Sequence, residues 1–155
     1  CLVEAEVGRI KGHGYEGGYA GDDYLARTED CVRLAKETGV DLLAVGIGTA
    51  HGYYEGTPKL SFERLHEIHQ ALTIPLVLHG GTGLAADDVR RCIADGICKV
   101  NVGTCIASAY MNGMKNELER QGENAFVIEV IPSVRAAVKS EVDGWIRTCM
   151  GDGKA

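Results

Sequence analysis

The strongest constraint on the fold is an alternation of short apolar runs with amphipathic stretches, repeated four times within 155 residues. The apolar runs are continuous rather than alternating, which is typical of parallel strands buried on both faces. They predict strands at residues 2–7, 41–47, 75–78 and 97–102. Strand followed by helix, repeated in this way, predicts an α/β protein with a parallel sheet.

The amphipathic stretches between these runs predict helices. Ser61 is a side chain suited to cap a helix start, and Asp95-Gly96 is suited to end one. A glycine-rich segment over residues 8–21 and a second segment over 48–59 predict loops. The expected helices cover residues 25–38, 61–71, 85–94, 104–120 and, behind Pro132, 133–148.

Four strand–helix units make half of an eight-fold barrel. A closed (β/α)8 TIM barrel needs eight strands and roughly 200–250 residues. Residues 1–155 are therefore predicted to form the C-terminal half of such a barrel. The strands at 2–7 and 97–102 would then have open edges unless another half-barrel covers them.

Composition and charge narrow the class of partner. A net charge of −6 disfavours nucleic acid and anionic membrane surfaces, which favour a basic face. No run approaches the ~18–20 apolar residues of a membrane span. The six cysteines contain no C-x-x-C pair, which predicts reduced thiols and a cytoplasmic location.

Two histidines occupy matching places after neighbouring strands. His51 and His79 each follow an apolar run and precede a glycine, and Glu6 lies near the end of the first run. Parallel strands bring their carboxyl ends to one edge of the sheet, where barrels keep their active sites. Two imidazoles and a carboxylate predict a divalent-metal site, with zinc as the expected ion. The alternative is that each histidine is an ordinary hydrogen-bonded residue at the barrel rim.

Two glycine-containing turns are suited to bind an anion. Residues 79–83 and 101–104 each follow a strand and lead directly into a helix. Unpaired N–H groups and a partial positive charge at a helix N-terminus favour phosphate. The alternative is that both segments are plain tight turns.

Two further polar segments carry weaker functional signals than the strand-end histidines. The glycine-rich segment over residues 8–21 predicts a loop that moves over the site, with Glu16 or Glu4 as a proton-transfer carboxylate. A merely flexible connection is the alternative. His66 and His69 are three residues apart, whereas the helical zinc-protease motif requires four, so both are predicted to lie on a solvated helix edge.

Taken together, these segments resemble the class II, zinc-dependent fructose-bisphosphate and tagatose-bisphosphate aldolases, and they cover nearly the whole chain. The resemblance implies an eight-stranded barrel in which this chain supplies the last four strands. It rests on Val3-Glu4-Ala5-Glu6-Val7-Gly8, on Gly48-Thr49-Ala50-His51-Gly52 with Thr57-Pro58-Lys59-Leu60, on Pro75-Leu76-Val77-Leu78-His79-Gly80-Gly81-Thr82-Gly83, and on Lys99-Val100-Asn101-Val102-Gly103-Thr104.

The resemblance also implies roles for individual residues. His51 and His79 match two of three zinc-binding histidines, Glu6 matches a carboxylate at a second metal position, and a monovalent cation is a further implied cofactor. Glu16 matches the loop carboxylate that moves a proton, in a loop that is longer and richer in Gly and Tyr than usual. The residues that match the phosphate-gripping backbone are Gly52, Gly80, Gly81, Thr82, Asn101, Val102, Gly103 and Thr104.

The implied reaction is a metal-dependent retro-aldol cleavage. It would convert fructose-1,6- or tagatose-1,6-bisphosphate into dihydroxyacetone phosphate and glyceraldehyde 3-phosphate. Gly103 stands where one fructose-type branch carries Asp, which favours the tagatose-type branch. The family's third zinc histidine and its adjacent Asp belong to the N-terminal half, so the isolated chain is expected to have little activity.

Two alternatives remain. The chain could be a non-catalytic half-barrel that pairs with itself or with a partner, or an aldolase for another phosphorylated sugar. A homo-oligomer, or association with an N-terminal half-barrel, is expected in either case.

Overall fold

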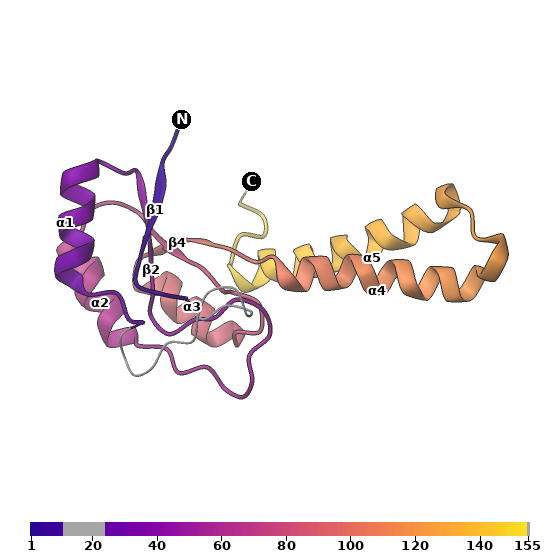
Figure 1. Cartoon of the computed structure of the whole chain (residues 1–155), viewed down its shortest axis with the longest axis horizontal. Coiled ribbons are helices and arrows are strands. Elements are labelled where there is room, and N and C mark those ends of the chain that lie inside the picture. The colour runs from indigo at the N-terminus through magenta and orange to yellow at the C-terminus, as the bar shows by residue number, and fades with distance from the viewer. Residues whose placement is uncertain (11–23, 155) are drawn as a thin grey trace. The chain divides into compact units, whose positions relative to one another are not determined.

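The computed structural model describes residues 1–10 and 24–154. It contains one parallel sheet of four strands, in which the spatial order follows the chain order (Figure 1). The predicted α/β architecture of successive strand–helix units is therefore confirmed. The strands are β1 (Glu4–Val7), β2 (Leu42–Val45), β3 (Leu76–Leu78) and β4 (Ile97–Val100).

The helices that connect these strands lie where the amphipathic stretches predicted them. Ser61 caps one of them, because its hydroxyl accepts a hydrogen bond from the Arg64 N–H at 3.3 Å. Asp95 ends another, and Gly96 follows it with a φ of +96°. The helices are α1 (Thr28–Thr38), α2 (Phe62–Ala71), α3 (Ala86–Ala94), α4 (Thr104–Gln121) and α5 (Val127–Thr148), with a short 3-10 helix, η1 (Gly122–Asn124), before α5.

The predicted start of the last helix at residue 133 is wrong. Helix α5 begins at Val127, and Pro132 lies inside it. The fixed φ of proline suits a helix, but at the sixth residue of α5 its missing N–H removes the hydrogen bond to the Ile128 carbonyl, a cost that packing must offset. The buried side chains of Val130 and Val134, one on each side of Pro132, show that packing continues through this point.

The chain forms two compact units, residues 1–102 and residues 103–155. The first unit contains the sheet and helices α1 to α3, and its core is built by the strands and by the inner faces of these helices. Burying a Val, Leu or Ile side chain stabilises a fold by roughly 1.5–3 kcal/mol. The largest fully buried aliphatic side chains of this unit are Leu43, Val45, Ile47, Leu65, Ile68, Leu76, Val77, Leu78 and Val89.

The sheet of the first unit has two open edges. β1 and β4 are its outer strands, and neither pairs with a further strand among residues 1–10 and 24–154. Leu2 and Val3, which lead into β1, are 75% and 55% exposed. Unpaired backbone groups beside exposed apolar side chains favour pairing with another chain segment.

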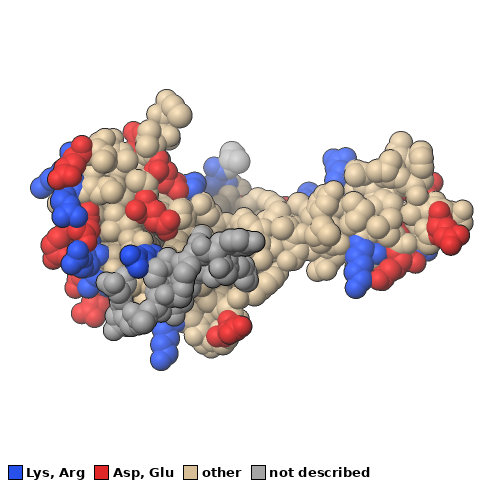
Figure 2. All heavy atoms as spheres, viewed as in Figure 1, with Lys and Arg blue, Asp and Glu red and all other residues tan. Residues whose placement is uncertain are grey.

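Acidic and basic side chains intermingle on the outer surface of this unit. Figure 2 shows both signs of charge over α1 and α2 on the face drawn. Asp30 pairs with Arg27 and with Arg33 at 2.8 Å each, and Arg64 pairs with Glu67 at 2.9 Å. No helix within the described ranges combines the length and the hydropathy needed to cross a membrane.

The second unit is a hairpin of helices α4 and α5. The two helices approach closely at Gly113, where a Cβ would lie 3.2 Å from both Val134 Cα and Ala137 Cβ. At the far end, the Glu117 carboxylate accepts hydrogen bonds from Arg120 at 2.9 Å and from Gln121 at 2.8 Å. The hydrogen bond from Arg120, followed by those from Gln121 and Ser133, lowers the pKa of Glu117 to about 2.

We expect this carboxylate to make the hairpin sensitive to acid. An unfolded Glu takes up its proton near its ordinary pKa, whereas the folded one stays ionised down to about pH 2. Its contribution to stability is therefore complete above the ordinary pKa and is lost as the pH falls toward 2. The midpoint temperature of thermal unfolding, measured from pH 6 to pH 2, should fall more steeply for the wild-type protein than for Glu117→Gln. Parallel curves would contradict the assignment.

Candidate active site

Polar side chains gather over one face of the sheet because of its register. Glu6 pairs with Ala44, Ala44 with Val77, and Val77 with Lys99, so these four residues form one row across the strands. Side chains two residues apart along a strand point to the same face. Glu4, His79 and Asn101 lie two residues from this row and therefore join the same face.

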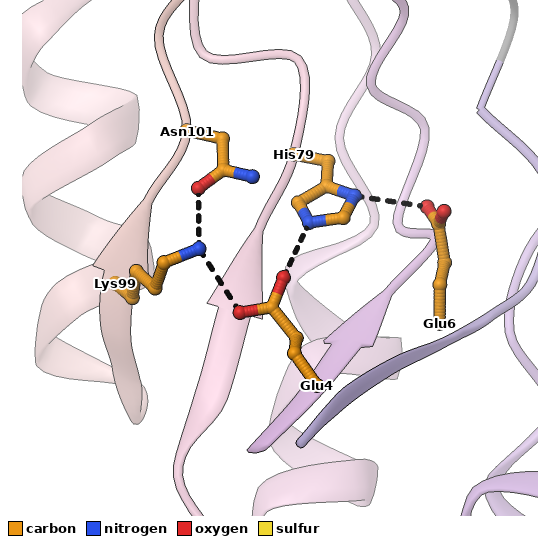
Figure 3. Close-up of polar contacts among 5 residues, drawn as sticks. All are labelled: Glu4, Glu6, His79, Lys99 and Asn101. Carbon is orange, nitrogen blue, oxygen red and sulfur yellow. Dashed lines mark hydrogen bonds and ion pairs between the residues drawn. The ribbon is translucent and has the colours of Figure 1, made fainter. Parts of the chain in front are cut away.

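Figure 3 shows how the charged members of this cluster meet. His79 stands between two carboxylates, with Nε2 3.0 Å from Glu4 Oε1 and Nδ1 3.4 Å from Glu6 Oε1. Lys99 Nζ donates to Glu4 Oε2 at 2.9 Å and to Asn101 Oδ1 at 2.6 Å. The cluster thus links β1 with β4, the two outer strands of the sheet, through residues of β1, β4 and the segments that follow β3 and β4.

The cluster favours the ionised form of Glu4. The hydrogen bond with His79, followed by that from Lys99, lowers the pKa of Glu4 below its ordinary value. Two carboxylates then face one ammonium group and one imidazole. A neutral imidazole has only one N–H and can donate to only one of the two carboxylates. The space between His79 and Glu6 is therefore suited to a bound cation.

His51, the other predicted ligand, is exposed and lies in the segment that follows β2. A hollow of about 540 Å³ opens beside it, and its lining includes Tyr54 and Lys59. Within residues 1–10 and 24–154, no three His, Cys, Asp or Glu side chains are grouped so that they could hold a metal ion. The structure thus brings His79 and Glu6 together and does not show a complete ligand set.

The donor chemistry at this face nevertheless suits zinc. Imidazole nitrogen and carboxylate oxygen are both common zinc ligands, and catalytic zinc sites use three protein ligands. His79 and Glu6 provide two such groups in contact with each other. The described residues are therefore of the types that bind zinc, and His51, in the segment that follows β2, stays the predicted third ligand.

The turn after β3 is held tightly against the end of β4. The Gly81 N–H donates to the Asn101 carbonyl at 3.1 Å, so this amide is already engaged. A Cβ at Gly81 would come within 2.9 Å of Val100 and of Val102, which explains the need for glycine here. Thr82 is buried, and Gly52, in the other loop, is buried with a φ of +90°. Their phosphate-binding role stays a prediction.

The other predicted phosphate residues, Gly103 and Thr104, are the first two residues of the second unit. Gly103 precedes the first turn of α4, Thr104 begins that helix, and the Ala107 N–H donates to the Gly103 carbonyl at 2.9 Å. The predicted helix start at residue 104 is thus confirmed. Glu16, the predicted proton-transfer carboxylate, lies outside the described residues.

Both histidines of α2 lie near Asp95, the residue that ends α3. His66 is exposed, and its Nδ1 lies 2.9 Å from Asp95 Oδ1, which agrees with a solvated helix edge. For His69 the prediction was only partly right. His69 is half-buried, because its ring packs against the backbone of Gly96. A Cβ at Gly96 would come within 2.6 Å of this ring.

Sequence reasoning missed two residues of this region. Lys99 was part of a recognised segment but was given no role, although it lies two residues before Asn101, and period-two spacing on a strand puts both on one face. Tyr54 was not selected because nothing in the local sequence shows that its hydroxyl reaches the segment after β3, 26 residues further along the chain.

Four parallel strands, joined by helices and neighbouring one another in chain order, match a partial (β/α)8 barrel. A family model described as fructose-bisphosphate aldolase class-II matches residues 1–154. The chain therefore belongs to the class II fructose-bisphosphate aldolase family.

Solved structures agree with this assignment. The YdjI aldolase from Escherichia coli K12 is 31% identical, with a TM-score of 0.80 over 99% of this chain and 51% of that one. A candidate fructose-1,6-bisphosphate aldolase from Coccidioides immitis is 26% identical, with a TM-score of 0.82 over 99% and 53%. A Campylobacter jejuni fructose-bisphosphate aldolase, 18% identical, shares the fold with a TM-score of 0.74 over 97% and 52%. The chain spans about half the length of these proteins.

Proposed function

We propose that this chain is the C-terminal half of a class II aldolase barrel and supplies part of its active site. The observation that carries the proposal is the cluster of Glu4, Glu6, His79 and Lys99 over one face of a parallel sheet. The reaction would be cleavage of fructose-1,6- or tagatose-1,6-bisphosphate to dihydroxyacetone phosphate and glyceraldehyde 3-phosphate. The two open sheet edges support association with four further strands.

His79, His51 and Glu6 are the residues we propose to hold zinc. When bound, zinc would supply Lewis acidity toward a ketone oxygen of the substrate. Within the chain itself, Glu4 accepts a hydrogen bond from the imidazole of His79 and so fixes the orientation of that ring. Lys99 in turn keeps Glu4 ionised and in place.

The remaining proposed roles concern the phosphate group and the proton. Gly52, Gly80, Gly81, Thr82, Asn101 and Val102 are proposed to line the site of the ketose phosphate. Gly103 and Thr104, at the start of α4, are proposed for the same group because a helix N-terminus offers unpaired N–H donors. Glu16 is proposed to move a proton at the carbon next to the ketone.

The test compares the chain alone with the chain combined with an N-terminal half-barrel. We expect the chain alone to show no measurable cleavage, and the assembled protein to bind zinc and release dihydroxyacetone phosphate. Parallel assays with the fructose and tagatose bisphosphates would give the ratio of the two kcat/KM values and so identify the substrate.

Three outcomes would contradict the proposal. The first is cleavage by the chain alone, and the second is an assembled protein that binds stoichiometric zinc but cleaves neither sugar. The third is a stable, metal-free homodimer of the chain, which would favour the non-catalytic half-barrel. The denaturing mass of the purified protein shows whether the two halves are one polypeptide or two.

A further inference from the structure

One hydroxyl joins the two loops that carry His51 and His79. The Ala50 N–H donates to the Tyr54 hydroxyl oxygen at 3.1 Å, and that hydroxyl donates to the Gly80 carbonyl at 2.7 Å. Ala50 directly precedes His51, and Gly80 directly follows His79. The phenol group therefore bridges the backbone next to one histidine and the backbone next to the other.

The backbone of the two loops is in close contact at the same place. Gly80 has a φ of +70°, and a Cβ there would come within 2.5 Å of the Ala50 carbonyl oxygen. Such an approach leaves no space for a side chain between the loops. The hydroxyl of Tyr54 is thus part of a tight junction in which each loop restricts the position of the other.

The aromatic ring of Tyr54 is itself held in place. A Cβ at Gly83 would lie 3.2 Å from Tyr54 Cδ2, so the Gly83 backbone packs against the ring. Burial raises the pKa of Tyr54 above its ordinary value, which keeps the hydroxyl protonated and able to donate to the Gly80 carbonyl at neutral pH.

We propose that Tyr54 is a positioning residue that fixes the spacing between His51 and His79 through the backbone of Ala50 and Gly80. The inference rests on the proposed function, in which both histidines bind the same metal ion. A ligand pair on two separate loops binds a metal more tightly when its spacing is fixed before the metal arrives. Tyr54 itself need not contact the metal or the substrate.

The test is Tyr54→Phe in the assembled barrel, which removes the hydroxyl and keeps the ring that packs on Gly83. We expect zinc affinity, measured by competition with a chelator, to fall roughly 10–100-fold, as for other residues that orient metal ligands. The visible spectrum of the cobalt-substituted protein should shift as well. Tyr110→Phe is the matched control, because Tyr110 lies on α4 and is 44% exposed.

The outcomes separate this inference from the proposed function. A wild-type protein that binds no zinc contradicts the metal site itself. A wild-type protein that binds zinc, with the same affinity and cobalt spectrum in Tyr54→Phe, overturns only the role of Tyr54. If Tyr54→Phe does not fold, hydrogen exchange of the Ala50 amide in the metal-free wild-type protein decides. Slow exchange supports the bridge, and exchange as fast as in an open loop overturns it.

Discussion

Replacing His79 with alanine in the assembled barrel is expected to reduce aldol cleavage by more than about 100-fold, since even the loss of a residue that orients a metal ligand costs about 10–100-fold. His79 contacts both Glu4 and Glu6, so its removal leaves two carboxylates near each other without the imidazole between them. Zinc affinity should fall together with kcat. Steady-state cleavage assays and zinc content after gel filtration measure the two effects.

His66→Ala is the matched control for this substitution. His66 is an exposed histidine of α2, and its imidazole pairs with Asp95 rather than with the cluster around His79. We expect this variant to keep wild-type activity and zinc content. Wild-type activity in His79→Ala would mean that the cluster in Figure 3 is structural and that the active site lies elsewhere.

Gly48→Ala is expected to destabilise the first unit by roughly 3–5 kcal/mol, the range reached by the most damaging single substitutions. Gly48 has a φ of +108°, a conformation that residues with a Cβ rarely adopt. A Cβ there would also overlap the carbonyl oxygen of Lys59, which is backbone and cannot rotate away. Denaturant unfolding of the purified variant measures the loss.

Gly56→Ala separates the two causes of this loss. Gly56 also has a positive φ, of +86°, but nothing lies within 4 Å of the position where its Cβ would be. Its substitution should therefore destabilise the unit only through the unfavourable positive φ, by roughly 1–2 kcal/mol. Equal losses for the two variants would show that the contact with Lys59 contributes nothing.

Local sequence patterns were sufficient to predict the secondary structure of this chain. Continuous apolar runs gave the four parallel strands, and Ser61 and Asp95-Gly96 marked helix ends, because these signals depend on neighbouring residues only. The error at α5 has the same origin. Pro132 is a strong local signal for a helix boundary, and only the packing of Val130 and Val134 shows that the helix passes through it.

The candidate site was predictable in part. The positions of His79 and Glu6 near strand ends indicated that they would converge, and the structure places them 3.4 Å apart. The contact of Lys99 with Glu4 joins residues 95 positions apart, so no local pattern could indicate it. Whether His51 completes a ligand set with them stays a prediction, which the zinc and activity measurements address.

The sequence by itself determined the class of fold, the number of strands and the segments that carry polar side chains, because periodicity and turn chemistry act over a few residues. Only the tertiary structure decided which of these side chains meet. The register between strands puts Glu6 and Lys99 in one row, and the fold of the loop brings the Tyr54 hydroxyl to Gly80. Such contacts depend on backbone placement across distant segments, which the packing of the whole sheet fixes.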